Sequence, residues 1–192
     1  MKYNFDLLDK KKEYALYFVP SKVKIFSAHW FIQLKAKQTI KKYKLEGIKD
    51  DIATHSAMLI WLENDWWIYE SHIKAGVTKY PASLIQTESY ICAYQEDLII
   101  ERMNAMIGRS YGKLDMLGFA NEYLGVKNSN WHKLDCGEFC TEYFLKCLTE
   151  DGFLNYMLFY DSTINSKLKA YQYEPVMQQY YAIKSGKEII KL

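Results

Sequence analysis

The sequence of 192 residues contains few residues that break or crosslink a chain: three prolines, nine glycines and four cysteines. No linker rich in proline, glycine or serine divides it, so we expect a single domain over residues 1–192, a common domain size. Long apolar runs are missing as well, and no stretch of about 18 apolar residues predicts a transmembrane helix. The first residues lack the apolar core of a signal peptide, which predicts a cytoplasmic protein.

A strong charge of one sign is also missing. The 25 basic and 23 acidic residues leave a formal net charge of +2, which is too small to indicate a nucleic-acid-binding surface. Apolar residues make up 49% of the chain, and this content excludes a disordered protein. The lysine-rich segment 30–44 indicates a solvated helix or loop face, with an anion-binding or membrane-surface patch as the alternative.

The four cysteines do not form a metal-binding or disulfide pattern. Cys136 and Cys140 are four residues apart, which is a helical spacing and not the Cys-x-x-Cys spacing of zinc sites. A disulfide framework would require export, and no export signal is seen. We therefore expect reduced thiols, no bound metal and no cofactor.

Apolar patterns predict a small antiparallel sheet. The segment His55–Leu62 is an apolar run typical of a buried strand. Residues 66–71 (WWIYES) are aromatic and β-branched, which predicts the returning strand of a hairpin. Between them, residues 63–65 (Glu-Asn-Asp) indicate a turn. A further short strand is predicted at Val23–Phe26.

Two segments have helical periodicity. Apolar residues recur at helical spacing in Asp97–Ile107, and Gly108 is a stop signal. A longer apolar stripe begins at Cys136, where Asp135 is a good N-cap, and Gly152 closes the segment. These strands and helices together predict an α+β fold in which the sheet packs against the helix that starts at Cys136.

Cys136 is the leading candidate for a reactive residue. A thiol at the start of a helix lies near unpaired N–H groups and the positive end of the helix dipole, which favour the nucleophilic thiolate. Asp135 acts in the opposite direction, because a nearby carboxylate disfavours a thiolate unless it caps the helix. Cys140 and Cys147, further along the same helix, are expected to be small core residues, and this role is also the alternative for Cys136.

A nucleophilic thiol needs a base, and the four histidines are His29, His55, His72 and His132. His55 opens the predicted strand, and a histidine projecting from the end of a rigid element has good geometry for a general base. His132 lies four residues before Cys136 in a polar segment and is expected to be exposed. The alternative for His55 is a capped or solvated histidine at the edge of the sheet.

Glu70, on the returning strand, is the candidate for orienting the imidazole of His55. If the hairpin pivots at residues 63–64, the two side chains are diagonal neighbours on one sheet face, about 7–8 Å apart between Cα atoms. If it pivots at residues 64–65, they share the face but lie too far apart. His72 shares the face of Glu70 and is the alternative orienting residue.

Three segments in chain order carry a family resemblance: His55-Ser-Ala-Met-Leu-Ile, Tyr69-Glu70-Ser71 and Cys136-Gly-Glu-Phe-Cys. Two more segments, Gly76-Val77 and Gly108-Arg-Ser-Tyr111-Gly, match the same pattern. Together they resemble the permuted NlpC/P60 papain-like cysteine hydrolases, in particular the YiiX-like members. The resemblance covers roughly residues 20–150 and leaves 153–192 as a C-terminal extension of unknown role.

The resemblance implies a permuted papain-like fold and a catalytic triad of Cys136, His55 and Glu70. His55 would take the proton of Cys136, and the thiolate would attack an amide or ester carbonyl to form an acyl-enzyme. Family members cleave peptidoglycan-type amides, or cleave and transfer acyl groups on lipids. The implied substrate is therefore a small molecule, peptide or lipid with a scissile carbonyl.

Two further alternatives follow from the same residues. A phage-encoded or delivered enzyme would reconcile cytoplasmic synthesis with a cell-wall substrate. A catalytically silent papain-like binding or structural module is the competing class, since Asp135 and Gly137 flank the thiol.

The aromatic residues near the predicted site either form an apolar acyl groove or pack the sheet: Trp61, Trp66, Trp67 and Tyr69.

Overall fold

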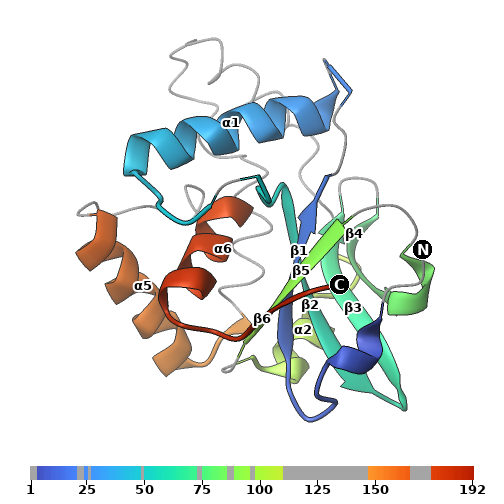
Figure 1. Ribbon diagram of the computed structural model, residues 1–192. Coiled ribbons are helices and arrows are strands. Elements are labelled where there is room, and N and C mark those ends of the chain that lie inside the picture. The colour runs from blue at the N-terminus through green and yellow to red at the C-terminus, as the bar shows by residue number, and fades with distance from the viewer. Residues whose placement is uncertain are drawn as a thin grey trace.

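The computed structural model describes residues 4–20, 24, 25, 27–48, 50–72, 75–85, 89–95, 98–109, 147–164 and 174–192. In these residues six strands form one sheet in the order β4-β3-β2-β1-β5-β6, and each neighbouring pair is antiparallel. Four α-helices accompany the sheet (Figure 1). The described chain is therefore an α+β protein with an antiparallel sheet, as the sequence predicts.

The strands are β1 (Tyr14–Val19), β2 (His55–Leu62), β3 (Asp65–His72), β4 (Gly76–Pro81), β5 (Ser89–Tyr94) and β6 (Ile189–Lys191). The α-helices are α1 (Ala28–Tyr43), α2 (Ile100–Met106), α5 (Glu150–Ile164) and α6 (Pro175–Lys184). Two 3-10 helices are η1 (Phe5–Leu7) and η2 (Ala82–Leu84). The predicted strand over residues 55–62 is confirmed, and the returning strand is one residue longer at each end.

The β2–β3 hairpin turns on two residues. Glu63 and Asn64 have φ angles of 54° and 64°, and positive φ at both positions of a two-residue loop matches the type I′ turn that suits the twist of the strands. Leu62 pairs with Asp65, and Met58 pairs with Tyr69. The hairpin therefore pivots at residues 63–64, the first of the two predicted registers.

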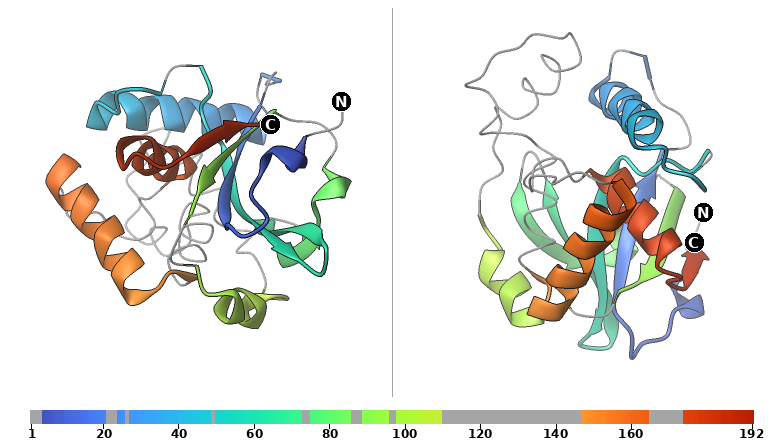
Figure 2. Two further views of the ribbon diagram at one scale, coloured as in Figure 1. Left: turned by 60° about the horizontal axis from the view of Figure 1, so that its bottom comes forward. Right: turned by 90° about the vertical axis from the view of Figure 1, so that its left-hand side faces the viewer.

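One face of the sheet carries the four described α-helices. A single buried cluster joins this face to the helices through Met58 and Tyr69 of the sheet, Ala36 of α1, Met103 of α2, Tyr156 of α5 and Met177 of α6. The helices α5 and α6 lie side by side, and the ring of Phe159 is 5.0 Å from that of Tyr181 (Figure 2). Burying side chains of this size stabilises the fold by about 1.5–3 kcal/mol each.

The opposite face of the sheet has a second buried cluster, covered by short elements. Its sheet residues alternate with those of the helix face, as the pleat requires: Leu16 and Phe18 in β1, Ala57 and Leu59 in β2, and Trp66 and Ile68 in β3. Leu8, which follows η1, and Ala82 of η2 pack over them. This face carries no described α-helix.

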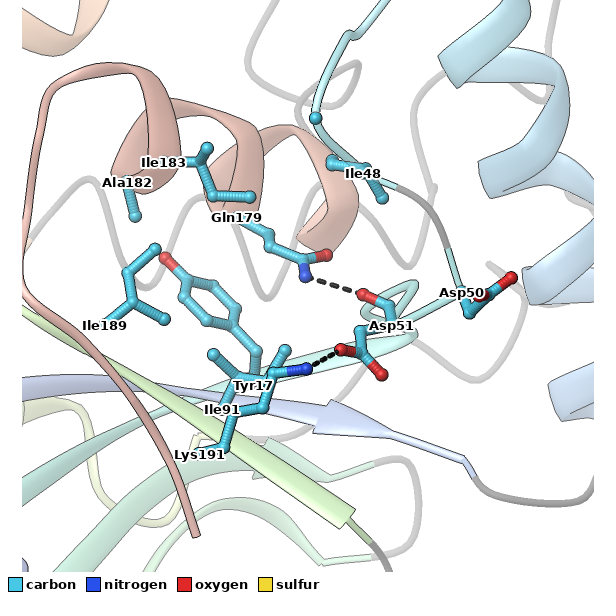
Figure 3. A pocket seen from close by; sticks show the side chains of 11 residues that line it. Tyr17, Ile48, Asp50, Asp51, Ile91, Gln179, Ala182, Ile183, Ile189 and Lys191 are labelled. Carbon is cyan, nitrogen blue, oxygen red and sulfur yellow. Dashed lines mark hydrogen bonds and ion pairs between the residues drawn. The ribbon is translucent and has the colours of Figure 1, made fainter.

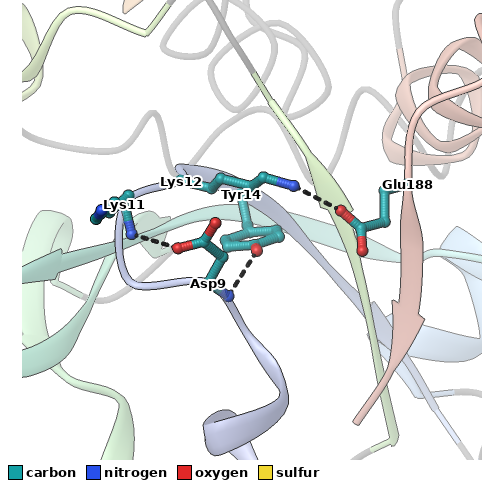
Figure 4. A network of polar contacts seen from close by, with 5 residues as sticks. All are labelled: Asp9, Lys11, Lys12, Tyr14 and Glu188. Atoms are coloured by element: carbon teal, nitrogen blue, oxygen red, sulfur yellow. Dashed lines mark hydrogen bonds and ion pairs between the residues drawn. The ribbon is translucent and has the colours of Figure 1, made fainter.

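The C-terminal segment is an integral part of the sheet. The strand β6 pairs with β5, and α6 contributes buried residues to the core. An ion pair of 2.9 Å joins Lys12, before β1, to Glu188, before β6, and the hydroxyl of Tyr14 accepts a hydrogen bond from the backbone N–H of Asp9 (Figure 4). Residues 174–192 thus complete one edge of the sheet and tie it to the N-terminal turn.

Three secondary-structure predictions differ from the structure. The strand predicted at Val23–Phe26 is wrong, because Lys24 and Ile25 lie outside any strand and Ile25 is 64% exposed. The helix predicted over Asp97–Ile107 is shorter, since Leu98 instead forms an antiparallel bridge. Gly152 does not close a helix but lies in the first turn of α5, where its N–H donates to the hydroxyl of Thr149.

The helix predicted to start at Cys136 falls largely outside the described residues, as do Cys140, His132 and the rest of segment 110–146. Cys147, the first described residue after it, is buried. None of the described helices combines the length and apolarity that crossing a bilayer requires.

Candidate active site

His55 and Glu70 are brought together by the hairpin. Because Met58 pairs with Tyr69, position 57 lies opposite position 70, and the side chains of His55 and Glu70 project from one face as diagonal neighbours. The Nε2 atom of His55 is 2.7 Å from Oε2 of Glu70. The predicted juxtaposition of these two residues is confirmed.

The imidazole of His55 is held on its other side by β1. His55 pairs with Phe18 across the strands, and the ring centroids of the two side chains are 4.9 Å apart at an interplanar angle of 65°. The N–H of Thr54 donates to the carbonyl of Phe18 at 3.1 Å and fixes the start of β2. The side chain of His55 remains 25% exposed, so the ring is oriented and still open to solvent.

Glu70 is more deeply buried, with 8% of its side chain exposed. The hydroxyl of Tyr80, in β4, donates to Oε1 of Glu70 at 2.7 Å. Each carboxylate oxygen thus has its own partner, which a buried carboxylate needs in order to be stable. Burial and then the Glu70 carboxylate raise the pKa of Tyr80, so this hydroxyl stays protonated and donates.

The arrangement defines what the imidazole can do. A neutral histidine has one donor and one acceptor nitrogen. A carboxylate can only accept, so the contact with Glu70 favours the tautomer with the proton on Nε2. Nδ1 is then the basic nitrogen of the ring. A histidine held in this way by a carboxylate is equipped to accept a proton from an acidic group that approaches Nδ1.

The His55–Glu70 pair lies on the sheet face that carries no described α-helix. Phe18 belongs to the buried cluster of that face, and its ring is 4.9 Å from that of Tyr90. Cys147 instead belongs to the core under the helices and is fully buried. Burial raises the pKa of the Cys147 thiol to about 12, which agrees with the expected role of Cys147 as a core residue.

The second described thiol is also a core residue. Cys92, on β5, is fully buried in the same cluster as Phe18, and burial raises the pKa of its thiol. A protonated, solvent-shielded thiol is a poor nucleophile. Neither Cys92 nor Cys147 therefore has the environment of a reactive cysteine.

The predicted nucleophile, Cys136, lies outside the described residues, but residues 108 and 109, which precede it in the chain, bond to β4 near Glu70. The N–H of Gly108 donates to the carbonyl of Val77, and the N–H of Val77 donates to the carbonyl of Arg109, both at 2.9 Å. Val77 is the neighbour of Thr78, which pairs with Glu70. The segments Gly76-Val77 and Gly108-Arg109, both singled out in the sequence, therefore lie side by side.

The aromatic residues of the hairpin do not form one groove. Trp61 and Trp66 project from the face of His55, with ring centroids 5.4 Å apart, whereas Tyr69 lies in the core under the helices. Tyr69 is fully buried, and its hydroxyl donates to Asn104 at 2.9 Å. Trp67 also projects from the helix face, so sheet packing accounts for these residues better than a single acyl groove.

Sequence reasoning missed Tyr80 and Phe18. Tyr80 reaches Glu70 because Tyr80 pairs with Ile68 across β3 and β4, which places its side chain on the sheet face of Glu70. Phe18 lies on a strand that was not predicted. His72, the alternative orienting residue, has its backbone in β3, while its side chain lies outside the described atoms; Glu70 is the residue bonded to His55.

No group of three or more His, Cys, Asp or Glu side chains suited to a metal ion occurs within the part of the chain that the structure describes.

Comparison with protein-family models, with curated proteins and with solved structures found no match. The interpretation of the site therefore depends on its own geometry.

Proposed function

We propose that this protein is a cysteine hydrolase with a permuted papain-like fold, in which Cys136 is the nucleophile, His55 the general base and Glu70 the residue that positions the base. The observation that supports this proposal is the 2.7 Å contact between Nε2 of His55 and Oε2 of Glu70. A partly exposed histidine bonded to a buried carboxylate is the base-and-orienter half of such a triad.

The proposed reaction proceeds through an acyl-enzyme. Nδ1 of His55 takes the proton of the Cys136 thiol, and the thiolate attacks the carbonyl carbon of an amide or ester. The backbone N–H of Cys136 donates to the developing oxyanion. The imidazolium returns its proton to the leaving amine or alcohol, and water, deprotonated by His55, then releases the acid and regenerates the thiol.

The surroundings of the pair support a rigid base. Phe18 packs against the imidazole, and Tyr80 holds the second oxygen of Glu70. Both residues lie on strands, and sites built on strands are held more precisely than sites on loops. The base therefore needs little rearrangement when the thiol and the substrate approach.

The proposed substrate is a peptide, a small molecule or a lipid with a scissile carbonyl, such as a peptidoglycan-type amide or a lipid acyl ester. In this proposal the enzyme is made in the cytoplasm, and for a cell-wall substrate it is phage-encoded or delivered to the wall. In this proposal the thiol of Cys136 comes within hydrogen-bonding distance of Nδ1 of His55.

The test is the rate of iodoacetamide labelling of each cysteine against pH, followed by peptide mass mapping. We expect Cys136 to label much faster than Cys92 and Cys147, with reactivity that persists below about pH 7. His55→Ala should slow labelling of Cys136 and lower kcat/KM by about 10²–10⁴-fold. Cys136→Ala should abolish hydrolysis, while Cys92→Ala should leave kcat unchanged in the folded fraction.

The competing function is a papain-like binding or structural module without catalysis. It is favoured by the sequence around the thiol, where Asp135 precedes Cys136 and a nearby carboxylate disfavours a thiolate. In that case Cys136 would label slowly, with an inflection near or above about pH 8.5, and His55→Ala would leave its labelling rate unchanged. The labelling experiment therefore separates the two functions.

A further inference from the structure

A cavity of about 270 Å³ lies on the helix face of the sheet, between α6, the chain before β2 and strands β1, β5 and β6 (Figure 3). Most of its wall is apolar, formed by Ile48, Ile91, Ala182, Ile183 and Ile189. Its volume is close to the lower end of the range for small-molecule sites, about 300–1,000 Å³.

The hydroxyl of Tyr17 is a polar group in the wall of this cavity. Tyr17, in the central strand β1, is 2% exposed, and its hydroxyl points toward Ala182 and Ile189 (Figure 3). Among the residues that the structure describes, none forms a hydrogen bond with this hydroxyl. The hydroxyl is therefore available to donate a hydrogen bond to a molecule in the cavity that Tyr17 lines.

The other polar side chains in the same wall are occupied or turned outward. Gln179 donates from Nε2 to the carbonyl of Asp51 at 2.6 Å and accepts at Oε1 from the N–H of Ala53 at 3.0 Å. Lys191 forms an ion pair with Asp51. Asp50 is exposed, and its carboxylate points away from the cavity (Figure 3). The cavity thus combines an apolar middle with a hydroxyl at one end that is left for a ligand.

We propose that this cavity is a binding site for a small neutral organic molecule, with an apolar body and a carbonyl or ether oxygen that accepts a hydrogen bond from Tyr17. The apolar body would lie against Ile48, Ile91 and Ile183. The site is separate from the proposed catalytic pair, because Tyr17 and Phe18 are consecutive in β1 and therefore project from opposite faces of the sheet.

The groups that line the cavity predict that it binds neutral molecules and excludes anions. Burial raises the pKa of the Tyr17 hydroxyl above its ordinary value, so this group stays protonated and can donate. The apolar wall would also penalise an anion, since burying a charge without a charged partner is costly. Lys191, the cation among the lining residues, is already paired with Asp51. A neutral acceptor should therefore bind, and its carboxylate analogue should not.

The test uses acetophenone, which carries a carbonyl oxygen, isopropylbenzene, which has nearly the same shape without it, and benzoate. Binding to the full chain is followed by NMR titration. We expect acetophenone to bind, with shifts centred on Ala182 and Ile183, and benzoate not to bind. Tyr17→Phe should weaken acetophenone about 3- to 10-fold, the effect of one hydrogen bond, and leave isopropylbenzene unchanged.

Tyr14→Phe is the matched control, because Tyr14 lies on the same strand and is also buried, but projects from the other face and bonds to Asp9. It should leave acetophenone binding unchanged and lower the Tm. Tyr17→Phe should leave the Tm nearly unchanged, since the hydroxyl that it removes forms no hydrogen bond with a described residue. The proposal is overturned if acetophenone does not bind, if Tyr17→Phe weakens both ligands equally, or if Tyr17→Phe lowers the Tm as Tyr14→Phe does.

Discussion

Nε2 of His55 and Oε2 of Glu70 lie 2.7 Å apart across the β2–β3 hairpin, although the two residues are separated by fifteen positions in the chain. A hydrogen bond to a charged partner contributes about 1.5–3 kcal/mol. The contact thus joins the two strands and fixes the imidazole with its Nδ1 atom as the basic nitrogen. A hydrolase would use this orientation during catalysis, whereas a binding module would use it only for stability.

Glu70→Gln should separate these two roles. The amide keeps the shape of the carboxylate and removes its charge, so the proposed thiolate–imidazolium pair loses its stabilising partner. Losing about 1.5–3 kcal/mol corresponds to a roughly 10- to 100-fold decrease in kcat/KM and in the iodoacetamide labelling rate of Cys136 near pH 6.5. Glu101→Gln, an exposed carboxylate on α2, is the control and should change neither rate. Equal labelling rates in the two variants would contradict a positioning role for Glu70.

Tyr80→Phe should show a milder form of the same effect. The substitution leaves the Nε2–Oε2 contact in place but removes the hydrogen bond to the other oxygen of Glu70. Leaving a buried acceptor without its partner costs about 1–3 kcal/mol. We expect the free energy of unfolding, measured in urea, to fall by this amount. The labelling rate of Cys136 should fall less than it does in Glu70→Gln, and a larger fall would show that Tyr80 is more important to the base than Glu70.

The hairpin could be predicted from sequence because both strands carry clear patterns. The apolar run of β2 and the aromatic run of β3 define two strands, and the short polar segment between them defines a turn. The register could not be fixed, since Glu63 gives no sign that it adopts a positive φ angle. The turn needs positive φ at both Glu63 and Asn64, and its position sets the register that brings His55 to Glu70.

Strands β1 and β6 could not be predicted, for different physical reasons. Every residue of β1 is buried, because β1 lies between β2 and β5 with both faces covered, so the sequence shows no alternation of apolar and polar residues. Strand β6 has three residues, too few for any pattern. Phe18 and Tyr17, which shape the candidate site and the cavity, therefore escaped sequence analysis.

Stability should fall steeply in alkaline solution. Burial raises the pKa of the Cys147 thiol from 9.0 to about 12 and raises the pKa values of Cys92, Tyr17 and Tyr80 as well. The folded state therefore holds these protons above pH 9, while the unfolded state releases them. Each group should reduce the free energy of unfolding by roughly 1 kcal/mol per pH unit once the pH passes its unfolded pKa.

Urea unfolding between pH 7 and pH 11 measures this dependence. Below about pH 8 these four groups are protonated in both states, so they should add no slope. Cys147→Ala should lower stability at every pH, because it removes a buried side chain, but its curve above pH 9 should be shallower than that of the unmodified chain. Parallel curves for the two proteins would show that the thiol of Cys147 does not titrate differently in the folded and unfolded states.

Glu174 should be one of the most sensitive charged positions in the chain. It lies at the N-terminus of α6, with 9% of its side chain exposed; it accepts a hydrogen bond from Thr39 at 3.0 Å and is 3.7 Å from Nζ of Lys35. The side chain of Lys35 is only 14% exposed. Glu174→Ala leaves the buried hydroxyl of Thr39 without its acceptor and removes the contact with Lys35, so it should reduce the free energy of unfolding by about 1–3 kcal/mol.

Glu188→Ala provides the comparison, since it also removes a glutamate from an ion pair, but the side chain of Glu188 is 53% exposed. Solvent screens such pairs, and we expect no measurable change in its urea midpoint. Lys35→Met combined with Glu174→Leu should recover part of the stability lost in Glu174→Ala, because two apolar side chains then fill the space of a largely buried ion pair. If Glu174→Ala and Glu188→Ala unfold at the same urea concentration, the contact between α1 and α6 does not stabilise the fold.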